Sequence, residues 1–258
     1  MLLILAAFAQ AISNTGNLSG QLTINRSVLD GFSTAVGGAA DVGFLNILNT
    51  EIKNSTLNGV FANSNGTGIN TILCWACYIH NNPTGIRLGT DNMEVSLTVV
   101  NSILSANTTA IIAAGNSSVT RTLRILNSDI ANNTAGITMT QAAGGYSPNV
   151  IVLANNILYG NTGTAVSINN ATVQFSGSGQ TNAFGGNGTD RNNFKVLSGD
   201  ITLTSNPFTS ATNFALIPGS AAKGAGVPGL FPGGTTTGYL DMGAAQSPMA
   251  QSSATSWN

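Results

Sequence analysis

The sequence predicts an all-β fold, a parallel β-solenoid in which short strands stack in successive coils. A short phrase built around Asn recurs along the chain, apolar residues recur at fixed offsets from it, and Asn or Gly recurs where the chain must turn. Units this short cannot bury a hydrophobic face alone, so neighbouring units must stack. Because the units contain no long runs of helix formers, a helical repeat is excluded.

The recurring phrase sets the period of the solenoid. It reads LNTEI over residues 48–52 and LNSDI over residues 126–130. Its anchors lie about 24 to 28 residues apart. They are Asn25, Asn49, Ala76, Asn101, Asn127, Asn155 and Asn182. We therefore expect about seven coils, which at ~4.8 Å per layer form a column on the order of 30 Å long.

Two columns of residues predict the inside and outside of the first strand in each unit. The column three residues after the anchor is apolar and mostly β-branched, which is typical of a buried strand position. It contains Val28, Ile52, Ile79, Leu104, Ile130 and Leu158. The column two residues after the anchor mixes charged and apolar residues, and we expect it to face water. It contains Ser27, Glu51, Tyr78, Ile103, Asp129 and Ile157.

Further columns predict a turn and two more strands. Six residues after the anchor the chain places Gly31, Ser55, Asn82, Asn107, Asn133 and Asn161. Asn and Gly tolerate left-handed backbone angles, and stacked Asn amides can bond from layer to layer, so the last four should form a structural ladder. The apolar columns are Val36, Val60, Ile86, Ile111, Ile137 and Val166, and Ile47, Cys74, Val99, Ile125 and Leu153. Three short strands per unit describe one coil of a parallel solenoid.

The repeated phrase, as in NSDIANNTAGI over residues 127–137, resembles the coils of right-handed parallel β-helix proteins of the pectin-lyase-like group. Residues 214–222 (FALIPGSAA) and 241–244 (DMGA) are similar to the segment that closes many bacterial β-helix repeat proteins, with Ala221 where many have Pro. The first likeness covers residues 18–206. It implies a single-stranded right-handed parallel β-helix with short terminal caps.

These boundaries predict three parts of the chain. Residues 1–17 form an N-terminal cap or a signal-like segment, because residues 1–11 are apolar and end in the small residues of AQA but lack a basic start. Residues 18–206 form the β-helix. Residues 207–258 form a C-terminal closing segment and tail.

The composition limits the classes of partner. The chain has 258 residues, 7% of them charged, and a net charge of -1. Nucleic-acid binding depends on clustered Lys and Arg, and the eight present are scattered, so we expect no nucleic-acid partner. No apolar run reaches the ~18 residues of a membrane span.

Cys74 and Cys77, followed by His80, suggest a redox or metal site, but the columns favour a structural role. Residues three apart on a strand point to opposite faces, so the two sulfurs should diverge. Cys74 takes a core position and Cys77 the position of Ser in other units. A zinc site would need a fourth ligand, and His80 is the only His. We expect no metal and no cofactor.

The carboxylates do not predict an active site. Glycoside hydrolysis needs paired carboxylates within about 10 Å, whereas Glu51 and Asp129 lie three layers apart. Glu94 beside Asp91 could reach Arg121, which we interpret as a rim salt bridge. A second charged group is expected to be a solvated loop. It consists of Asp190, Arg191, Lys195 and Asp200. No residue is predicted to be catalytic.

Aromatic side chains provide the remaining candidates for recognition. Tyr78 and Tyr159 lie at or beside the outward column and Trp75 precedes an anchor, so their rings could stack on sugars, although ordinary wall packing is the alternative. We expect a non-enzymatic, extracellular, cell-surface or virion-surface module with a structural, adhesive or glycan-binding role. The alternatives are a polysaccharide lyase or glycoside hydrolase acting on a lateral groove, and a subunit of an extracellular filament or virion spike. A polysaccharide or cell-surface glycan, or further copies of the chain, are the expected partners.

Overall fold

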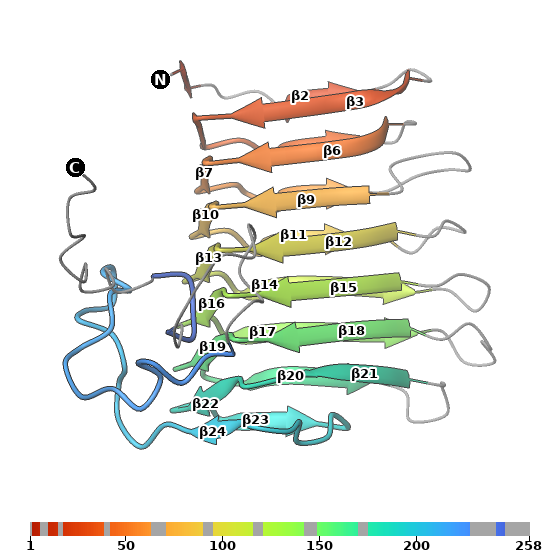
Figure 1. Ribbon diagram of the computed structural model, residues 1–258. Coiled ribbons are helices and arrows are strands. Elements are labelled where there is room, and N and C mark those ends of the chain that lie inside the picture. The colour runs from red at the N-terminus through yellow and green to blue at the C-terminus, as the bar shows by residue number, and fades with distance from the viewer. Residues whose placement is uncertain are drawn as a thin grey trace, which may run out of the picture.

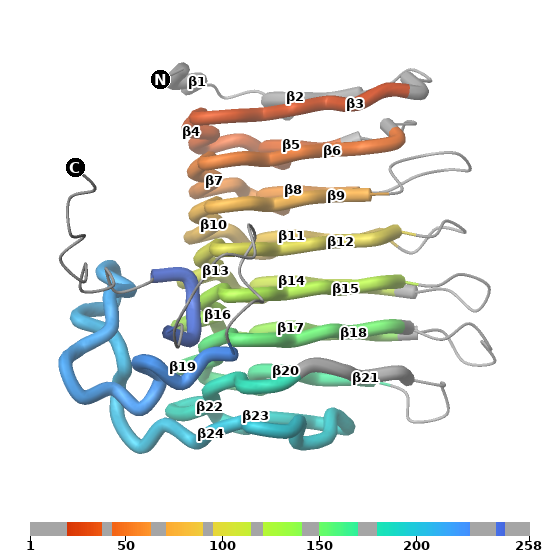
Figure 2. Tube along the Cα trace, in the orientation of Figure 1, coloured from red at the N-terminus to blue at the C-terminus, as the bar shows by residue number. Residues whose placement is uncertain are grey.

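The computed structural model is an all-β, right-handed parallel β-solenoid. It describes residues 2–5, 10–14, 18–38, 42–62, 71–89, 95–115, 121–141, 149–169, 175–227 and 241–245. The coils stack as rungs, and the chain passes through three parallel sheets in turn (Figures 1 and 2). Among the described residues the three sheets hold nine, eight and seven strands. The solenoid has about 5 turns, slightly fewer than the seven predicted.

The three sheets are built from every third strand. Sheet A contains β1 (Leu2–Leu5), β4 (Ser27–Asp30), β7 (Glu51–Lys53), β10 (Tyr78–His80), β13 (Ile103–Ser105), β16 (Asp129–Ala131), β19 (Ile157–Tyr159), β22 (Ala183–Gly185) and β24 (Ile201–Thr202). Sheet B contains β2 (Gln10–Asn14), β5 (Thr34–Gly38), β8 (Asn58–Ala62), β11 (Thr84–Leu88), β14 (Thr109–Gly115), β17 (Ala135–Gln141), β20 (Thr164–Asn169) and β23 (Thr189–Asn192). Sheet C contains β3 (Leu18–Asn25), β6 (Val42–Leu48), β9 (Thr71–Trp75), β12 (Val95–Val100), β15 (Arg121–Leu126), β18 (Asn149–Ala154) and β21 (Phe175–Gln180).

The interior is one stack of the predicted apolar columns. Ile52, Ile79, Leu104 and Ile130 pair in register along sheet A and are fully buried. The apolar columns of sheets B and C are likewise in register and buried. The predicted column is wrong in its first member, because Leu29, not Val28, pairs with Ile52 and is fully buried.

This one-residue slip comes from the first corner. Each corner between sheets C and A holds one residue with positive φ, and in the first complete coil that residue is Arg26 rather than Asn25. The same slip moves Gly31 out of the ladder column and into a second corner column with positive φ, beside Asn54 and Asn81. At the other end Thr181, not Asn182, takes the corner position. Among residues other than Gly, Asn is favoured in this conformation but is not required for it.

The Asn side chains of the turn column are hydrogen-bonded from coil to coil inside the solenoid. The Oδ1 of Asn133 accepts from the backbone N (2.9 Å) and Nδ2 (3.1 Å) of Asn107, and the Oδ1 of Asn161 accepts from both groups of Asn133. The Nδ2 of Asn133 also donates to the carbonyls of Leu104 and Ala131. The same pattern links Asn82 to Asn107 and Asn161 to Asn187. The amides thus satisfy backbone groups that a bend leaves unpaired.

The Asn ladder and a second, parallel ladder of side chains each end on a carboxylate. The first ends where Asn187 Nδ2 donates to Asp190 (2.8 Å). A second ladder runs through Ser102, Ser128, Asn156 and Asn182 and ends on Asp200, whose Oδ1 accepts from the backbone N and Nδ2 of Asn182. Asp200 also forms an ion pair with Arg191 (2.8 Å), and its side chain is only 2% exposed. The predicted solvated loop is therefore wrong for Asp200, although Lys195 is exposed.

Residues 207–227 and 241–245, here called the cover, fold back against the outer face of sheet A (Figure 1). Phe208, Phe214 and Met242 form a second hydrophobic cluster with Ile157 and Ala183 of the sheet. The prediction that the outward column faces water is consequently wrong for Asp129 and Ile157, which are both 0% exposed. No pattern within the repeats signals this burial, because the covering residues come from outside the repeats.

The N-terminal strands β1 and β2 join sheets A and B in parallel register with β4 and β5. The division of the chain into a cap or signal-like segment, a β-helix and a closing segment stays a prediction. Among the described residues, no helix is long and apolar enough to cross a membrane.

Candidate functional site

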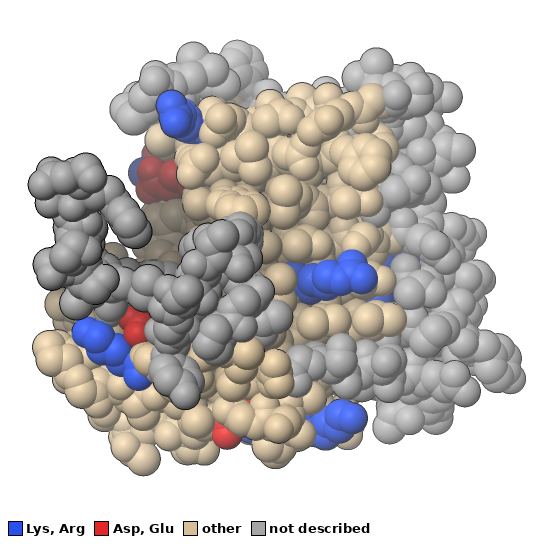
Figure 3. Space-filling view, in the orientation of Figure 1, with Lys and Arg blue, Asp and Glu red and all other residues tan. Residues whose placement is uncertain are grey.

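The cover contacts the outer face of sheet A only in part, and beside it strands β4, β7 and β10 present a group of polar side chains. These residues, here called the open patch, are Asp30, Glu51, Lys53, Tyr78 and His80. They share a face because Ile52 and Ile79 point inward between them and strand residues alternate. In Figure 3, acidic side chains gather on the side where β7 lies in Figure 1, on a surface with few charges.

Parallel register brings the patch residues together. Tyr78 pairs with Glu51, and His80 pairs with Lys53, which pairs in turn with Asp30. Paired residues on adjacent strands lie about 4.8 Å apart. Residues far apart in the sequence thus form one compact group.

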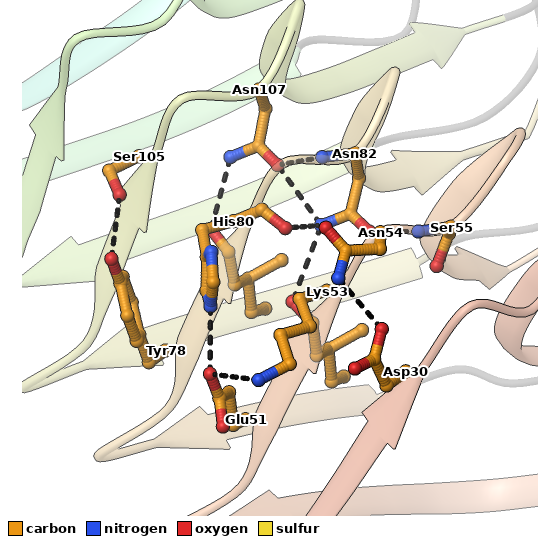
Figure 4. Close-up of polar contacts among 12 residues, drawn as sticks. Asp30, Glu51, Lys53, Asn54, Ser55, Tyr78, His80, Asn82, Ser105 and Asn107 are labelled. Carbon is orange, nitrogen blue, oxygen red and sulfur yellow. Dashed lines mark hydrogen bonds and ion pairs between the residues drawn. The ribbon is translucent and has the colours of Figure 1, made fainter. Parts of the chain in front are cut away.

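Glu51 is the centre of the patch (Figure 4). Its Oε1 accepts from Nε2 of His80 (2.9 Å) and from Nζ of Lys53 (3.0 Å). Because a carboxylate only accepts, the Nε2 of His80 carries the hydrogen and its Nδ1 is left for another contact. The exposed fractions of these side chains are 30% for Glu51, 25% for Lys53 and 12% for His80.

The contacts of Glu51 keep it charged. Partial burial acts to raise the pKa of Glu51, but the hydrogen bonds from His80 and Lys53 outweigh it and lower the pKa below its ordinary value. The hydrogen bond to Glu51 raises the pKa of Lys53. The carboxylate and the ammonium are therefore both ionised at neutral pH.

The aromatic ring of Tyr78 borders this group. It stacks on the ring of His80, with centroids 4.0 Å apart and an interplanar angle of 20°. Phe214 of the cover meets it edge-on at 6.2 Å, and the Oγ of Ser105 bonds to its hydroxyl at 3.5 Å. Nearby, Asn54 Nδ2 donates to Asp30 (2.7 Å). Each polar group of the patch is therefore already oriented.

The structure does not bring the three aromatic candidates together. Tyr78 lies in the open patch, whereas Tyr159 lies three strands away on β19, where its ring meets Phe208 of the cover edge-on at 6.3 Å. Trp75 ends β9 on sheet C, half-buried between Leu48 and Val100 of the neighbouring strands. Their glycan contacts stay a prediction, and of the three only Tyr78 adjoins charged side chains.

Sequence reasoning missed Glu51, Lys53 and His80 as a group. The sequence-based hypotheses consider Glu51 only as a carboxylate partner of Asp129, and His80 only as a metal ligand beside the two Cys. A signal was present, because Lys53 and His80 take equivalent outward positions in successive units and Glu51 lies two residues before Lys53. Aligning the outward column of Glu51 with the outward column of Lys53 and His80 predicts that the three side chains are neighbours.

The two cysteines are free thiols in the core, 0% and 2% exposed. They take the predicted columns, since Cys74 pairs with Ile47 and Val99, and the backbone N of Cys77 bonds to Ser102 in the second ladder. The expected divergence of their sulfurs is wrong. Ala76 has positive φ (52°) and turns the chain, so that the two thiols contact each other.

The other charged candidates do not form a site among the described residues. Asp91 and Glu94 lie outside these residues, and Arg121 is 1% exposed, with its guanidinium donating to the carbonyl of Gly89 (3.1 Å) rather than lying at a rim. Glu51 and Asp129 are three strands apart, as predicted. In the described part of the chain, no three His, Cys, Asp or Glu side chains gather to hold a metal.

Comparison with known proteins adds no relative, because no protein-family model, no curated protein and no solved structure matches the chain.

Proposed function

We propose that the protein is a non-enzymatic β-helix module, secreted or presented on a cell or virion surface, that binds a glycan through the open patch. The observation that carries this proposal is a hydrogen-bonded group of Glu51, Lys53 and His80 beside the ring of Tyr78, on the part of sheet A that the cover leaves open. We also propose, from the likeness of the repeats, that the β-helix is of the pectin-lyase-like type.

The patch has the chemistry that sugar hydroxyls require. The carboxylates of Glu51 and Asp30 accept hydrogen bonds, Lys53 donates them, and the Nδ1 of His80 is an additional acceptor. These side chains already hold one another in place, so binding a ligand costs little additional side-chain conformational entropy. An aromatic ring at the border contributes apolar contact to the faces of a sugar.

The charge of the patch favours a neutral glycan. Asp30 and Glu51 place two carboxylates beside the single ammonium of Lys53, so the carboxylates outnumber the ammonium. A polyuronate would meet like charge, which weakens association. The ligand class we expect is therefore a neutral polysaccharide or surface glycan.

The enzymatic alternative has less support. Hydrolysis needs one carboxyl group as acid and a second as base or nucleophile across the scissile bond. Glu51 is held ionised by the hydrogen bonds from His80 and Lys53, and Asp190 and Asp200 terminate the ladders. A filament or spike subunit would use the outer face of sheet C, where Phe44 is 56% exposed, but a single apolar side chain specifies no partner.

A glycan array with neutral and acidic glycans, followed by calorimetry on the hits, tests the proposal. Glu51→Gln and His80→Ala should each weaken binding about tenfold, as expected for the loss of one charged hydrogen bond. Arg124→Ala, at an exposed position on sheet C, is the matched control and should bind as wild type. Unchanged affinity in both patch variants would refute the site, and depolymerisation of a polysaccharide that Glu51→Gln abolishes would establish the enzyme instead.

A further inference from the structure

Asp129 is a carboxyl group buried beneath the cover. It lies at an outward position of β16 yet is 0% exposed, and its neighbours in the same column are Ile103 and Ile157. Neither of its oxygens has a hydrogen bond of full geometry. A buried carboxyl without partners is costly to ionise. Asp129 is therefore stable as the neutral acid while buried, and its ionised form is favoured only in contact with water.

Residues 241–245 close over this carboxyl. Gly243 has φ of +91°, and a Cβ at this position would overlap the Oδ1 of Asp129. The backbone N of Gly243 donates to the carbonyl of Asn155 (2.7 Å), and that of Met242 donates to Ala222 (2.9 Å). These few contacts fix the short segment directly against sheet A (Figure 1, dark blue).

No cation from the covering side balances Asp129. From Gly224 to the C-terminus the sequence contains one charged side chain, Asp241, whose Oδ1 accepts from the backbone N of Gly224 (2.7 Å). Lys223, just before this stretch, is exposed. On the sheet, the side chains beside Asp129 in neighbouring strands are Ile103 and Ser105 of β13 and Ile157 and Tyr159 of β19. An ionised Asp129 would therefore be a buried and unpaired charge.

The corner between sheets C and A, next to Asp129, also contains buried polar groups that lack hydrogen-bond partners. Both polar side-chain atoms of Asn127, and the Oδ1 of Asn101 one coil earlier, are buried without partners. In the next coil, Asn155 of the same corner column is bonded to the cover, accepting from the backbone N of Val227 (2.9 Å) and donating to its carbonyl (3.2 Å). The cover thus satisfies the polar side chain of this corner in one coil only among these three.

We propose that residues 241–245 act as a clasp, docked on sheet A while Asp129 is protonated and detached once Asp129 ionises. Detachment exposes Asp129, which extends the polar strip of sheet A beyond the open patch. The clasp is independent of glycan binding.

The direction of the pH dependence follows from linkage. Burial raises the pKa of Asp129 well above its ordinary value, and the backbone N–H of Ala244 offsets this only in part. The docked state therefore binds the proton more tightly than the open state. Docking weakens as the pH rises above the ordinary carboxyl pKa of about 3.9, and continues to weaken up to the raised value.

Hydrogen exchange of residues 241–245 between pH 4 and pH 8, corrected for intrinsic rates, tests the clasp. In wild type the protection should fall by up to about tenfold for each pH unit between the two pKa values. Asp129→Asn, which imitates the protonated group, should keep the segment protected throughout. Asp30→Asn removes a carboxylate of the open patch and should behave as wild type.

Gly243→Ala provides a second variant, because its Cβ would clash with Asp129 and should leave the segment unprotected even at pH 4. Protection in wild type that does not change with pH, or an Asp129→Asn variant with the wild-type pH dependence, would overturn the proposal. Protection at pH 8 that appears with excess Ca²⁺ and disappears with EDTA would also overturn it, because a cation would then replace the proton.

Discussion

Glu51 and Asp129 occupy the same outward column of sheet A, three strands apart, yet their pKa values shift in opposite directions. Glu51 lies in the open patch, where His80 and Lys53 hold it charged. Asp129 lies under the cover, where burial favours its neutral form. The repeat supplies equivalent positions, and what lies over each position decides its chemistry.

The comparison extends to the aromatic residues. Tyr78 at the border of the open patch stacks on a polar ring, whereas Tyr159 under the cover packs against Phe208. One outer face is thus polar and partly exposed in one part and packed against the cover in the other.

Ile130→Asp should have the largest effect, because both parts of sheet A share the interior beneath them. Ile130 is 0% exposed, and an unpaired charge there should lower the free energy of unfolding by about 4 kcal/mol or more. Urea unfolding followed by circular dichroism measures it. Phe44→Asp, at a 56% exposed position, is the control. Equal stability of the two variants would show that the register of the core is wrong.

Phe208→Ala should separate the covered part from the open part. Phe208 is 3% exposed in the second cluster, and truncating a buried Phe costs about 3 kcal/mol. We expect hydrogen-exchange protection of the cover to fall while the circular dichroism of the solenoid persists. Leu57→Ala, at a 58% exposed position, should change neither. Simultaneous loss of both signals would mean that cover and solenoid unfold as one unit.

Asn133→Leu should destabilise both parts to a smaller extent. It removes the acceptor for two groups of Asn107 and the donor for two carbonyls, which should cost about 1 to 3 kcal/mol. The denaturation midpoint measures this loss. Asn46→Leu, on the outer face of sheet C, should leave the midpoint nearly unchanged. An equal loss in both variants would assign the effect to the amide in general and not to the ladder.

Glu51→Gln should have the smallest effect, under about 1 kcal/mol, because the ion pairs are partly exposed. The lowered pKa of Glu51 gives stability that is present above the ordinary Glu pKa of about 4.3 and lost as the pH falls through the lowered value. Wild type should therefore lose slightly more stability than Glu51→Gln between pH 7 and pH 3. Asp129→Asn should show the opposite sign, so the same sign in both variants would remove the contrast between the two carboxylates.

The solenoid, its core columns and the Asn ladder could be predicted from the sequence, because each is a local pattern that stacking repeats from coil to coil. Ile52, Ile79 and Leu104 are buried where their spacing places them, and Asn107 and Asn133 meet because equivalent residues lie one layer apart. Local pattern failed only at the ends of this series, where Arg26 and Thr181 take the corner position that Asn fills in most coils between them.

Which outward residues meet water depends on contacts between distant parts of the chain. The cover comes from residues outside the repeats, so no period within the repeats could place Phe208 over Tyr159 or Gly243 over Asp129. The grouping of Glu51, Lys53 and His80 likewise depends on the register of adjacent strands and on where the cover ends. Burial and charge pairing are properties of neighbours in space, and these neighbours lie far apart in the chain.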